Sequence, residues 1–316
     1  MAVSSSSSGL RPASPPAAAK VAGLDLGLYA VTVFVWGTSW IALKLQVGVV
    51  APEVSLLWRF ALAAIIMAGL LALRRKPWRF DWRMHLRFMV MGACLFCFNF
   101  LFFYYSAETI PSGLLSVVFS TAAIVNLFLS ALVQGTPLRR RMLLAAVLGS
   151  SGVACLFWPE IVDTSFDWAA FLGLLLCLLG VLCFSVGNIV SAETQAQGVP
   201  VLSANAWGMA YGCAILLLLS LLRDQAFIVE TTLAYLASLG YLAIFASVIA
   251  FASYLTLVGR IGAGRAGYAT VMFPVVALAI SSFFEGYSWT WIAALGVVLA
   301  LSGNLLILTG QRPKTA

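Results

Sequence analysis

Charged residues are scarce in this sequence, and their scarcity decides the class of protein. Only 9% of the 316 residues are Asp, Glu, Lys or Arg, whereas 62% are hydrophobic and the mean hydropathy is +1.03. A soluble globular domain carries about a quarter charged residues, and a water-soluble chain of this length could not hide so much apolar surface. The composition therefore excludes a soluble protein and predicts an integral membrane protein.

Side chains that perform chemistry are also few. The sequence has one histidine, His85, and it lacks an HExxH motif, paired Asp motifs, a Gly-rich phosphate loop and a Walker motif. A membrane-embedded transferase or protease needs a cluster of acid, base, nucleophile or metal-ligating groups, and an ion channel needs a selectivity filter. We therefore expect no enzyme, no cofactor and no metal site, with a membrane-embedded enzyme as a distant alternative.

No disulfide framework is expected. All six cysteines lie within apolar runs, where cysteine most often serves as a small packing residue. Cys94 and Cys97 have CxxC spacing, but a zinc or redox site would need further ligands or a polar, accessible helix end. We interpret both as packing residues.

The N-terminal residues lack aromatic side chains and an apolar segment, so we expect no secretory signal peptide. They are rich in Ser, Pro and Ala, which is typical of disorder, and we predict a disordered cytoplasmic tail over residues 1–25. Because residues 1–24 also lack acidic side chains, an organellar transit peptide is the alternative.

Long apolar runs fill the remaining chain. Each is close to the length of about 20 residues that a membrane-spanning helix needs. The predicted fold is an all-α integral membrane protein with ten transmembrane helices. The runs cover residues 26–46, 53–73, 86–106, 111–134, 140–158, 168–191, 201–222, 232–258, 265–285 and 289–309.

Lysine and arginine are distributed asymmetrically around these runs. Of the 18 Lys and Arg residues, all except Lys44, Arg59 and Arg223 fall on one side if every run crosses the membrane. Positively charged loops stay in the cytoplasm, so we predict a multi-pass protein of the inner (plasma) membrane with both termini cytoplasmic. The net charge of +7 is then a topology signal. The expected partners are a small-molecule substrate and the lipid bilayer, and no nucleic acid.

The chain repeats itself at an offset of 151 residues. Ile110 aligns with Ile261, and Gly113 aligns with Gly264. A unit of five spans is odd, so its second copy lies upside down in the membrane. We predict an inverted repeat of residues 26–158 and 168–310, the recurrent design of secondary transporters, with the substrate near the midplane between the halves.

Several motifs occur in the order and spacing of a known family. The sequence contains VWGTSW at 35–40, WRFALAA at 58–64, YYSAETIPSG at 104–113, and a run from Ser253 to Leu308 that includes Arg260, Pro274 and Glu285. From about residue 31 to 308 the chain resembles the ten-helix EamA-type branch of the drug/metabolite transporter superfamily. The resemblance implies transport of small molecules, often export of amino acids, related metabolites or drug-like cations.

Two positions depart from the family pattern. The position that matches Pro274 in the first half is Ala123, and the position that matches Glu285 is Gln134. The two halves are therefore unequal, and a residue's role in one half does not transfer to the other.

Arg59 is a candidate substrate-binding residue because a charge inside the membrane is costly and usually faces a cavity or a partner. A substrate carboxylate would suit it. The alternative is that Arg59 extends outward and pairs with Glu53. Trp36, Trp40 and Lys44 share one helix face, so the two tryptophans could bind an aromatic amino acid. An aromatic stripe can also serve for packing or as an interface anchor.

Polar and aromatic residues inside other runs complete the candidate site. A buried amide needs a partner, which a neighbouring helix or a substrate could supply. Pro274 interrupts its helix and frees a backbone carbonyl, with a packing kink as the alternative. The further candidates are Asn99, Phe103, Asn188, Ser247, Tyr254 and Tyr268.

Glu285 ends the ninth run beside Gly286. It could relay protons, but its place at a turn favours a structural role. The small-residue runs at 145–152 and 296–304 allow close helix packing, inside the bundle or at a homodimer face.

These observations predict a secondary transporter that works by alternating access. The expected substrate is an amino acid or related compound, and the expected direction is export. The first, third, fourth, sixth, eighth and ninth runs are expected to line its path. Efflux of a drug-like cation or another metabolite is the alternative.

Overall fold

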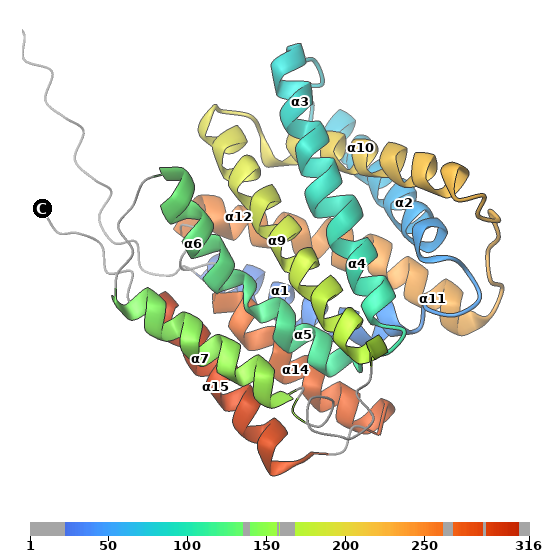
Figure 1. Cartoon of the computed structure of the whole chain (residues 1–316). Helices are drawn as coiled ribbons and strands as arrows, with labels where there is room; N and C mark the ends of the chain where they lie inside the picture. The colour runs from blue at the N-terminus through green and yellow to red at the C-terminus, as the bar shows by residue number, and fades with distance from the viewer. Residues whose placement is uncertain are drawn as a thin grey trace, which may run out of the picture.

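The computed structural model describes residues 23–134, 140–156, 158, 168–261, 268–286 and 289–309. Within these ranges every regular element is a helix, and the helices pack into one bundle (Figure 1). The helices of the first half are α1 (Gly23–Lys44), α2 (Pro52–Leu73), α3 (Trp82–Met91), η1 (Gly92–Phe98), α4 (Asn99–Ser106), α5 (Ser112–Ser120), α6 (Ala122–Gln134) and α7 (Arg140–Leu156). Those of the second half are α9 (Trp168–Ala196), α10 (Val201–Leu222), α11 (Leu233–Tyr241), η2 (Leu242–Ala250), α12 (Phe251–Ile261), α14 (Tyr268–Phe284) and α15 (Trp291–Thr309).

Six of the described helices are long and apolar enough to cross a membrane. They correspond to the first, second, third, sixth, seventh and eighth predicted runs. The other four runs contain shorter apolar helices of 10–17 residues. The all-helical membrane class is therefore confirmed, and the count of ten spans stays a prediction.

Helix boundaries follow local signals in the sequence. Pro52 opens α2 in its first turn, where a missing N–H costs nothing. Asp81 caps α3 by accepting a hydrogen bond from the backbone N–H of Met84 at 3.2 Å. Gly48 and Gly198 both have positive φ, at 140° and 83°. Each glycine turns the chain between two long helices, at positions that the repeat aligns.

The third and eighth runs each contain a π-helical segment in their middle. η1 separates α3 from α4, and η2 separates α11 from α12. A π-helix widens the turn and shifts the side chains that follow it onto a different face, and such segments occur often at functional sites. η1 packs against α10, while η2 packs against α2.

Close packing of α7 against α15 explains the small-residue runs. A Cβ atom on Gly152 would lie 2.6 Å from the carbonyl oxygen of Gly296 and 2.5 Å from the nitrogen of Ala300. The two helices lie side by side in Figure 1. The prediction that these runs pack inside the bundle is confirmed.

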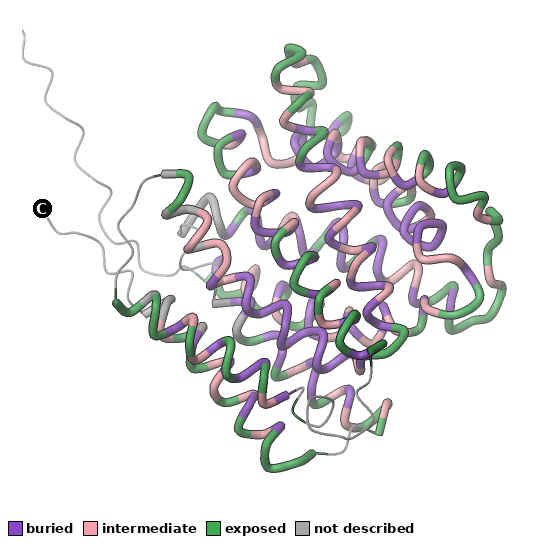
Figure 2. The backbone as a smooth tube through the Cα atoms, in the orientation of Figure 1, coloured by how far each residue is buried: buried purple, intermediate pink, exposed green. Residues whose placement is uncertain are grey.

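The outer surface of the bundle is apolar. Trp291 is 93% exposed and Phe283 is 88% exposed. Figure 2 shows buried residues gathered where helices meet and exposed residues on their outward faces. Large apolar side chains turned outward along the helices are suited to lipid contact and not to water.

Candidate functional site

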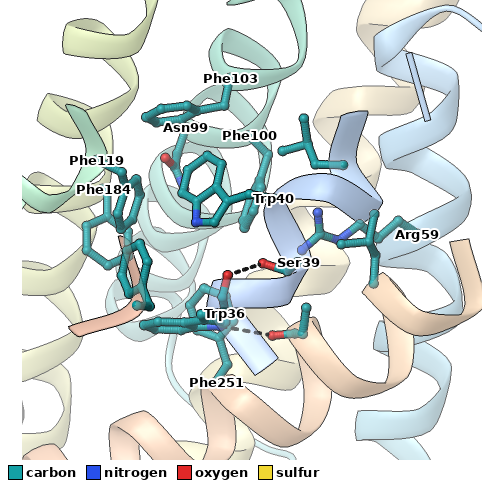
Figure 3. A pocket seen from close by; sticks show the side chains of 14 residues that line it. Trp36, Ser39, Trp40, Arg59, Asn99, Phe100, Phe103, Phe119, Phe184 and Phe251 are labelled. Atoms are coloured by element: carbon teal, nitrogen blue, oxygen red, sulfur yellow. Dashed lines mark hydrogen bonds between the residues drawn. The ribbon is translucent and has the colours of Figure 1, made fainter. Parts of the chain in front are cut away.

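A pocket lies where helices from both halves of the sequence meet (Figure 3). Its volume is about 40 Å³, enough for a few water molecules at roughly 10–15 Å³ each. An aromatic amino acid is far larger than this space, so its binding would require the lining side chains to move apart. The lining residues are Trp36, Ser39, Trp40, Leu43, Arg59, Asn99, Phe100, Phe103, Phe119, Phe184, Leu242, Ala246, Phe251 and Phe273.

Aromatic rings form most of the pocket wall. The ring centroid of Trp40 lies 5.3 Å from that of Phe103, 5.6 Å from that of Phe119 and 6.2 Å from that of Phe273. Phe119 in turn lies 4.7 Å from Phe184. The pairs of Trp40 with Phe103 and Phe119 are edge-to-face and its pair with Phe273 is stacked, and aromatic pairs in such arrangements each contribute about 0.5–1.5 kcal/mol beyond simple burial. Trp40 thus joins α1 to α4, α5 and α14.

Trp36 connects the pocket to the π-helical segment η2. Its indole nitrogen donates a hydrogen bond to the carbonyl oxygen of Ala246 at 3.3 Å. Its ring also lies 5.1 Å from Phe251 and 4.9 Å from Tyr254. The altered hydrogen-bond pattern of a π-helix makes a carbonyl available to a side chain outside that helix.

Arg59 is the one charged side chain that lines the pocket, and it is 2% exposed. Its Nε donates a hydrogen bond to the Oγ of Ser247 at 3.0 Å. The guanidinium carbon lies 4.4 Å from the ring centroid of Phe100 and 5.1 Å from that of Phe60. The Nη1 atom has no hydrogen-bond partner. Figure 3 shows the side chain extending from α2 toward Ser39 at the pocket centre.

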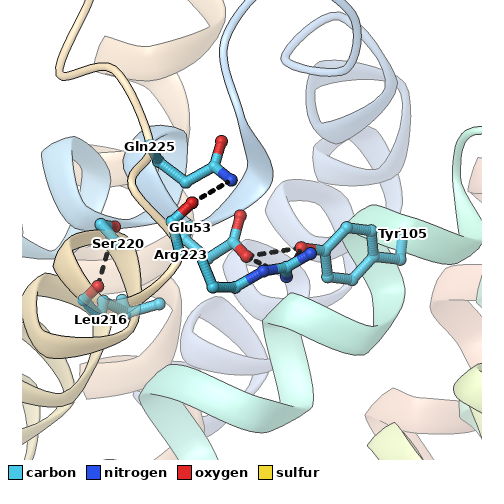
Figure 4. Close-up of polar contacts among 6 residues, drawn as sticks. All are labelled: Glu53, Tyr105, Leu216, Ser220, Arg223 and Gln225. Carbon is cyan, nitrogen blue, oxygen red and sulfur yellow. Dashed lines mark hydrogen bonds and ion pairs between the residues drawn. The ribbon is translucent and has the colours of Figure 1, made fainter.

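Pairing of Arg59 with Glu53, the alternative expected from sequence, is wrong. Glu53 is 1% exposed and accepts a hydrogen bond from the hydroxyl of Tyr105 at 2.5 Å. It also forms an ion pair with Arg223, whose Nη1 contacts the Tyr105 hydroxyl as well (Figure 4). The Glu53 carboxylate raises the pKa of the Arg223 guanidinium above its ordinary value. Glu53 is therefore already neutralised by Arg223.

We call these three residues, Glu53, Tyr105 and Arg223, the polar tie. It joins the start of α2, the end of α4 and the residue that follows α10. Figure 4 also shows Gln225, whose side chain donates to the backbone oxygen of Arg223 at 3.2 Å and so helps to place it. The polar tie thus connects the two halves of the sequence at one end of the bundle.

Glu285 makes a second connection at the same end. Its carboxylate accepts hydrogen bonds from the backbone N–H and hydroxyl of Ser112, the first residue of α5. It accepts another from the hydroxyl of Ser281 at 2.6 Å. Nearby, the ammonium of Lys44 donates to the carbonyl of Ala107. Glu285 therefore caps α5 across the halves and does not line the pocket.

The structure brings five of the predicted site residues into the pocket wall: Trp36, Trp40, Arg59, Asn99 and Phe103. Two more stand directly behind them, since Ser247 holds Arg59 and Tyr254 packs on Trp36.

The remaining predicted residues lie elsewhere. Asn188 on α9 does not line the pocket, and its side-chain nitrogen has no partner. Pro274 directly follows the lining residue Phe273 inside α14. Tyr268 begins α14, and its side chain falls outside the described residues.

Sequence reasoning missed much of the aromatic wall. Phe273 adjoins Pro274, and Phe184 aligns with Phe34 in the repeat, so both carried a usable signal. Phe100, Phe119 and Phe251 stand in apolar runs with no feature that separates them from lipid-facing phenylalanines.

Comparison with known proteins assigns the chain to a family. The EamA-like transporter family matches residues 26–158 and again residues 171–309. The uncharacterized transporter YoaV of Bacillus subtilis (strain 168) is 24% identical over 286 residues, with 90% of this chain and 94% of that protein covered. A probable amino-acid metabolite efflux pump of Escherichia coli (strain K12) is 25% identical over 294 residues, with 90% and 94% covered.

A known crystal structure shares the fold. It superposes with a TM-score of 0.65 at 17% identity, covering 89% of this chain and 95% of that chain. The two family matches cover both halves of the bundle and all of the elements that line the pocket. The chain therefore belongs to the EamA-like transporter family.

Proposed function

We propose that this protein is a secondary carrier that exports an amino acid or a related compound across the inner (plasma) membrane by alternating access. The observation that carries the proposal is the pocket, which is buried, aromatic and built from both halves of the chain. A carrier needs such a central site, since two halves that move against each other can expose it to either side in turn.

An inverted repeat of ten spans, which we propose as the architecture, would suit this mechanism. The family matches the chain twice, and Gly48 and Gly198 turn the chain at equivalent places in the two copies. The π-helical segments also occupy equivalent places. Packing of η1 on α10 mirrors packing of η2 on α2, as expected for two copies related by a two-fold axis in the membrane plane.

Contacts between helix ends support the proposed topology. The polar tie and the Glu285–Ser112 contact join ends that alternating spans place on the outer side. Arg87 pairs with Glu193 at 3.3 Å, and these residues fall near ends placed on the cytoplasmic side. Contacts between the two halves of the sequence therefore occur at both ends of the bundle.

The names of relatives support the substrate class and the direction. Two of them, from Escherichia coli and Salmonella typhimurium, are named as probable amino-acid metabolite efflux pumps. A drug-like cation is a poorer candidate, because it would enter a pocket whose only charged lining residue is Arg59.

Uptake of labelled amino acids into proteoliposomes tests this function, with and without a pH gradient to reveal proton coupling. We expect saturable uptake by the wild-type protein and a loss of at least tenfold in Trp40→Ala, because Trp40 contacts aromatic residues from three other helices at the pocket. The matched control is Trp291→Ala, since that tryptophan is 93% exposed on the bundle surface. Failure of the folded wild-type protein to move any solute would contradict the carrier function.

A further inference from the structure

We infer that the pocket binds its substrate through a carboxylate and disfavours compounds of net positive charge. Arg59 is the carboxylate-binding residue, and the aromatic wall binds the apolar part of the substrate. The inference rests on the proposed function, since it names the class of compound that the same pocket takes.

The first step is the state of Arg59. Its side chain is 2% exposed, and its Nη1 has no hydrogen-bond partner, although its Nε is held by Ser247. A charged group inside a membrane protein normally pairs with an opposite charge or serves the substrate path. The carboxylate nearest in sequence, Glu53, is occupied by Arg223 and Tyr105. Among the described residues no carboxylate neutralises Arg59, so a carboxylate that enters the pocket would supply the counter-charge.

The second step concerns geometry. A guanidinium presents two parallel N–H groups that match the two oxygens of a carboxylate. The side chain points into the pocket (Figure 3), and Ser247 and Phe100 fix its orientation. The hydroxyl of Tyr104 lies beside the Arg59 guanidinium and interacts with it, and its own O–H offers a further donor. An incoming carboxylate thus meets donors that are already in place.

The third step concerns a substrate of net positive charge. None of the described lining residues is Asp or Glu, so such a cation would find no carboxylate and would be repelled by Arg59, whereas an amino acid carries its own carboxylate. Aromatic faces can attract a cation, but Phe100 already carries the guanidinium. The free acceptor among the lining side chains is the Oδ1 of Asn99, which suits a neutral N–H or O–H donor.

Three ligands of the same shape test the inference: phenylacetate, phenylacetamide and phenethylammonium. We would measure their binding to the purified full chain in detergent at neutral pH by calorimetry, which avoids the leakage of weak acids through liposomes. We expect phenylacetate to bind at least tenfold more tightly than the amide, with the cation weakest. Equal affinities for acid and amide, or a preference for the cation, would overturn the inference.

Arg59→Met removes the charge and keeps an apolar side chain of similar length. We expect it to weaken phenylacetate binding at least tenfold and to change phenylacetamide binding less than threefold, whereas Arg59→Lys retains part of the preference for the acid. An unchanged acid-to-amide ratio in a folded Arg59→Met protein would show that another group binds the carboxylate. If the variant does not fold, the three wild-type affinities decide by themselves.

Parallel transport assays separate this inference from the carrier function. If the wild-type protein transports L-phenylalanine but does not bind phenylacetate, the carrier function stands and the selectivity inference fails. If phenylacetate binds with the expected preference but no solute crosses the bilayer, the selectivity inference stands and the carrier function fails.

Discussion

At the scale of single residues, Arg59 and Glu53 are two buried charges on one helix that differ in how well each is paired. Both lie within the first two turns of α2 and both are almost fully buried. Glu53 has an ion pair with Arg223, so its burial is compensated. Arg59 has one hydrogen bond and two aromatic neighbours, which compensate for its lost hydration only in part. We interpret Arg59 as a residue whose burial lowers the stability of the protein, in keeping with its proposed role in binding a carboxylate.

The incomplete compensation of Arg59 predicts that removal of its charge raises the stability of the protein. Burying a charge without a counter-charge costs desolvation free energy, so replacing it with an apolar side chain of similar volume can stabilise a protein. We expect Arg59→Met to raise the thermal midpoint of the ligand-free protein, and Arg59→Lys to leave it unchanged or lower it. The measurement is thermal unfolding in detergent, followed by tryptophan fluorescence. A lower midpoint for Arg59→Met would show that the guanidinium is already paired.

At the scale of helices, glycine determines how closely α7 and α15 approach. A methyl group on Gly152 would collide with the backbone of α15, where the close atoms are rigid. We expect Gly152→Ala to lower stability by about 1–3 kcal/mol, the usual cost of overpacking, as measured by thermal unfolding. The matched control is Gly240→Ala on α11, since a Cβ there has nothing within 4 Å. Equal effects of the two substitutions would contradict the observed packing.

Trp36 offers a second test at this scale. Trp36→Phe keeps an aromatic ring but removes the hydrogen bond to the carbonyl of Ala246 in η2. Loss of one buried hydrogen bond costs about 0.5–1.5 kcal/mol. We expect faster amide hydrogen exchange within Leu242–Ala250, measured by mass spectrometry, with no change in α7. Unchanged exchange in η2 would show that Trp36 does not hold the π-helical segment.

Helices were the most predictable part of this protein, because long apolar runs have one stable form in a bilayer. Arg59 and Trp40 could be predicted for the site because a charge and an indole stand out in an apolar run. The π-helical segments could not be predicted, since a sequence carries no sign of a widened turn. Ser247 and Tyr254 are seven residues apart and would share one face of a regular α-helix, whereas Ser247 lies in η2 and Tyr254 in α12. Phe119 lines the pocket because of tertiary packing, and no feature of the sequence around it indicates this.

At the scale of the whole molecule, the contacts at the proposed outer end oppose the motion that transport requires. The polar tie joins α2 and α4 of the first half to α10 of the second, and Glu285 joins α14 to α5. An outward-open state must break some of these bonds. In the proposed mechanism, the free energy of these contacts therefore determines the fraction of molecules in the outward-open state.

Glu53→Gln tests this connection, because it keeps the shape of the side chain and removes the charge that holds Arg223. Weakening the polar tie by about 1.4 kcal/mol would raise the open fraction tenfold. We expect a membrane-impermeant maleimide added outside to label Leu43→Cys about tenfold faster in the Glu53→Gln protein, in a background without native cysteines. Leu43 suits this purpose because it lines the pocket and is 4% exposed. Asp224→Asn changes a charge beside Arg223 but outside the polar tie, and should leave labelling unchanged. If Glu53→Gln labels no faster than wild type, the polar tie does not control access from the outside, and the other contacts between the halves, such as that of Glu285 with Ser112, must do so.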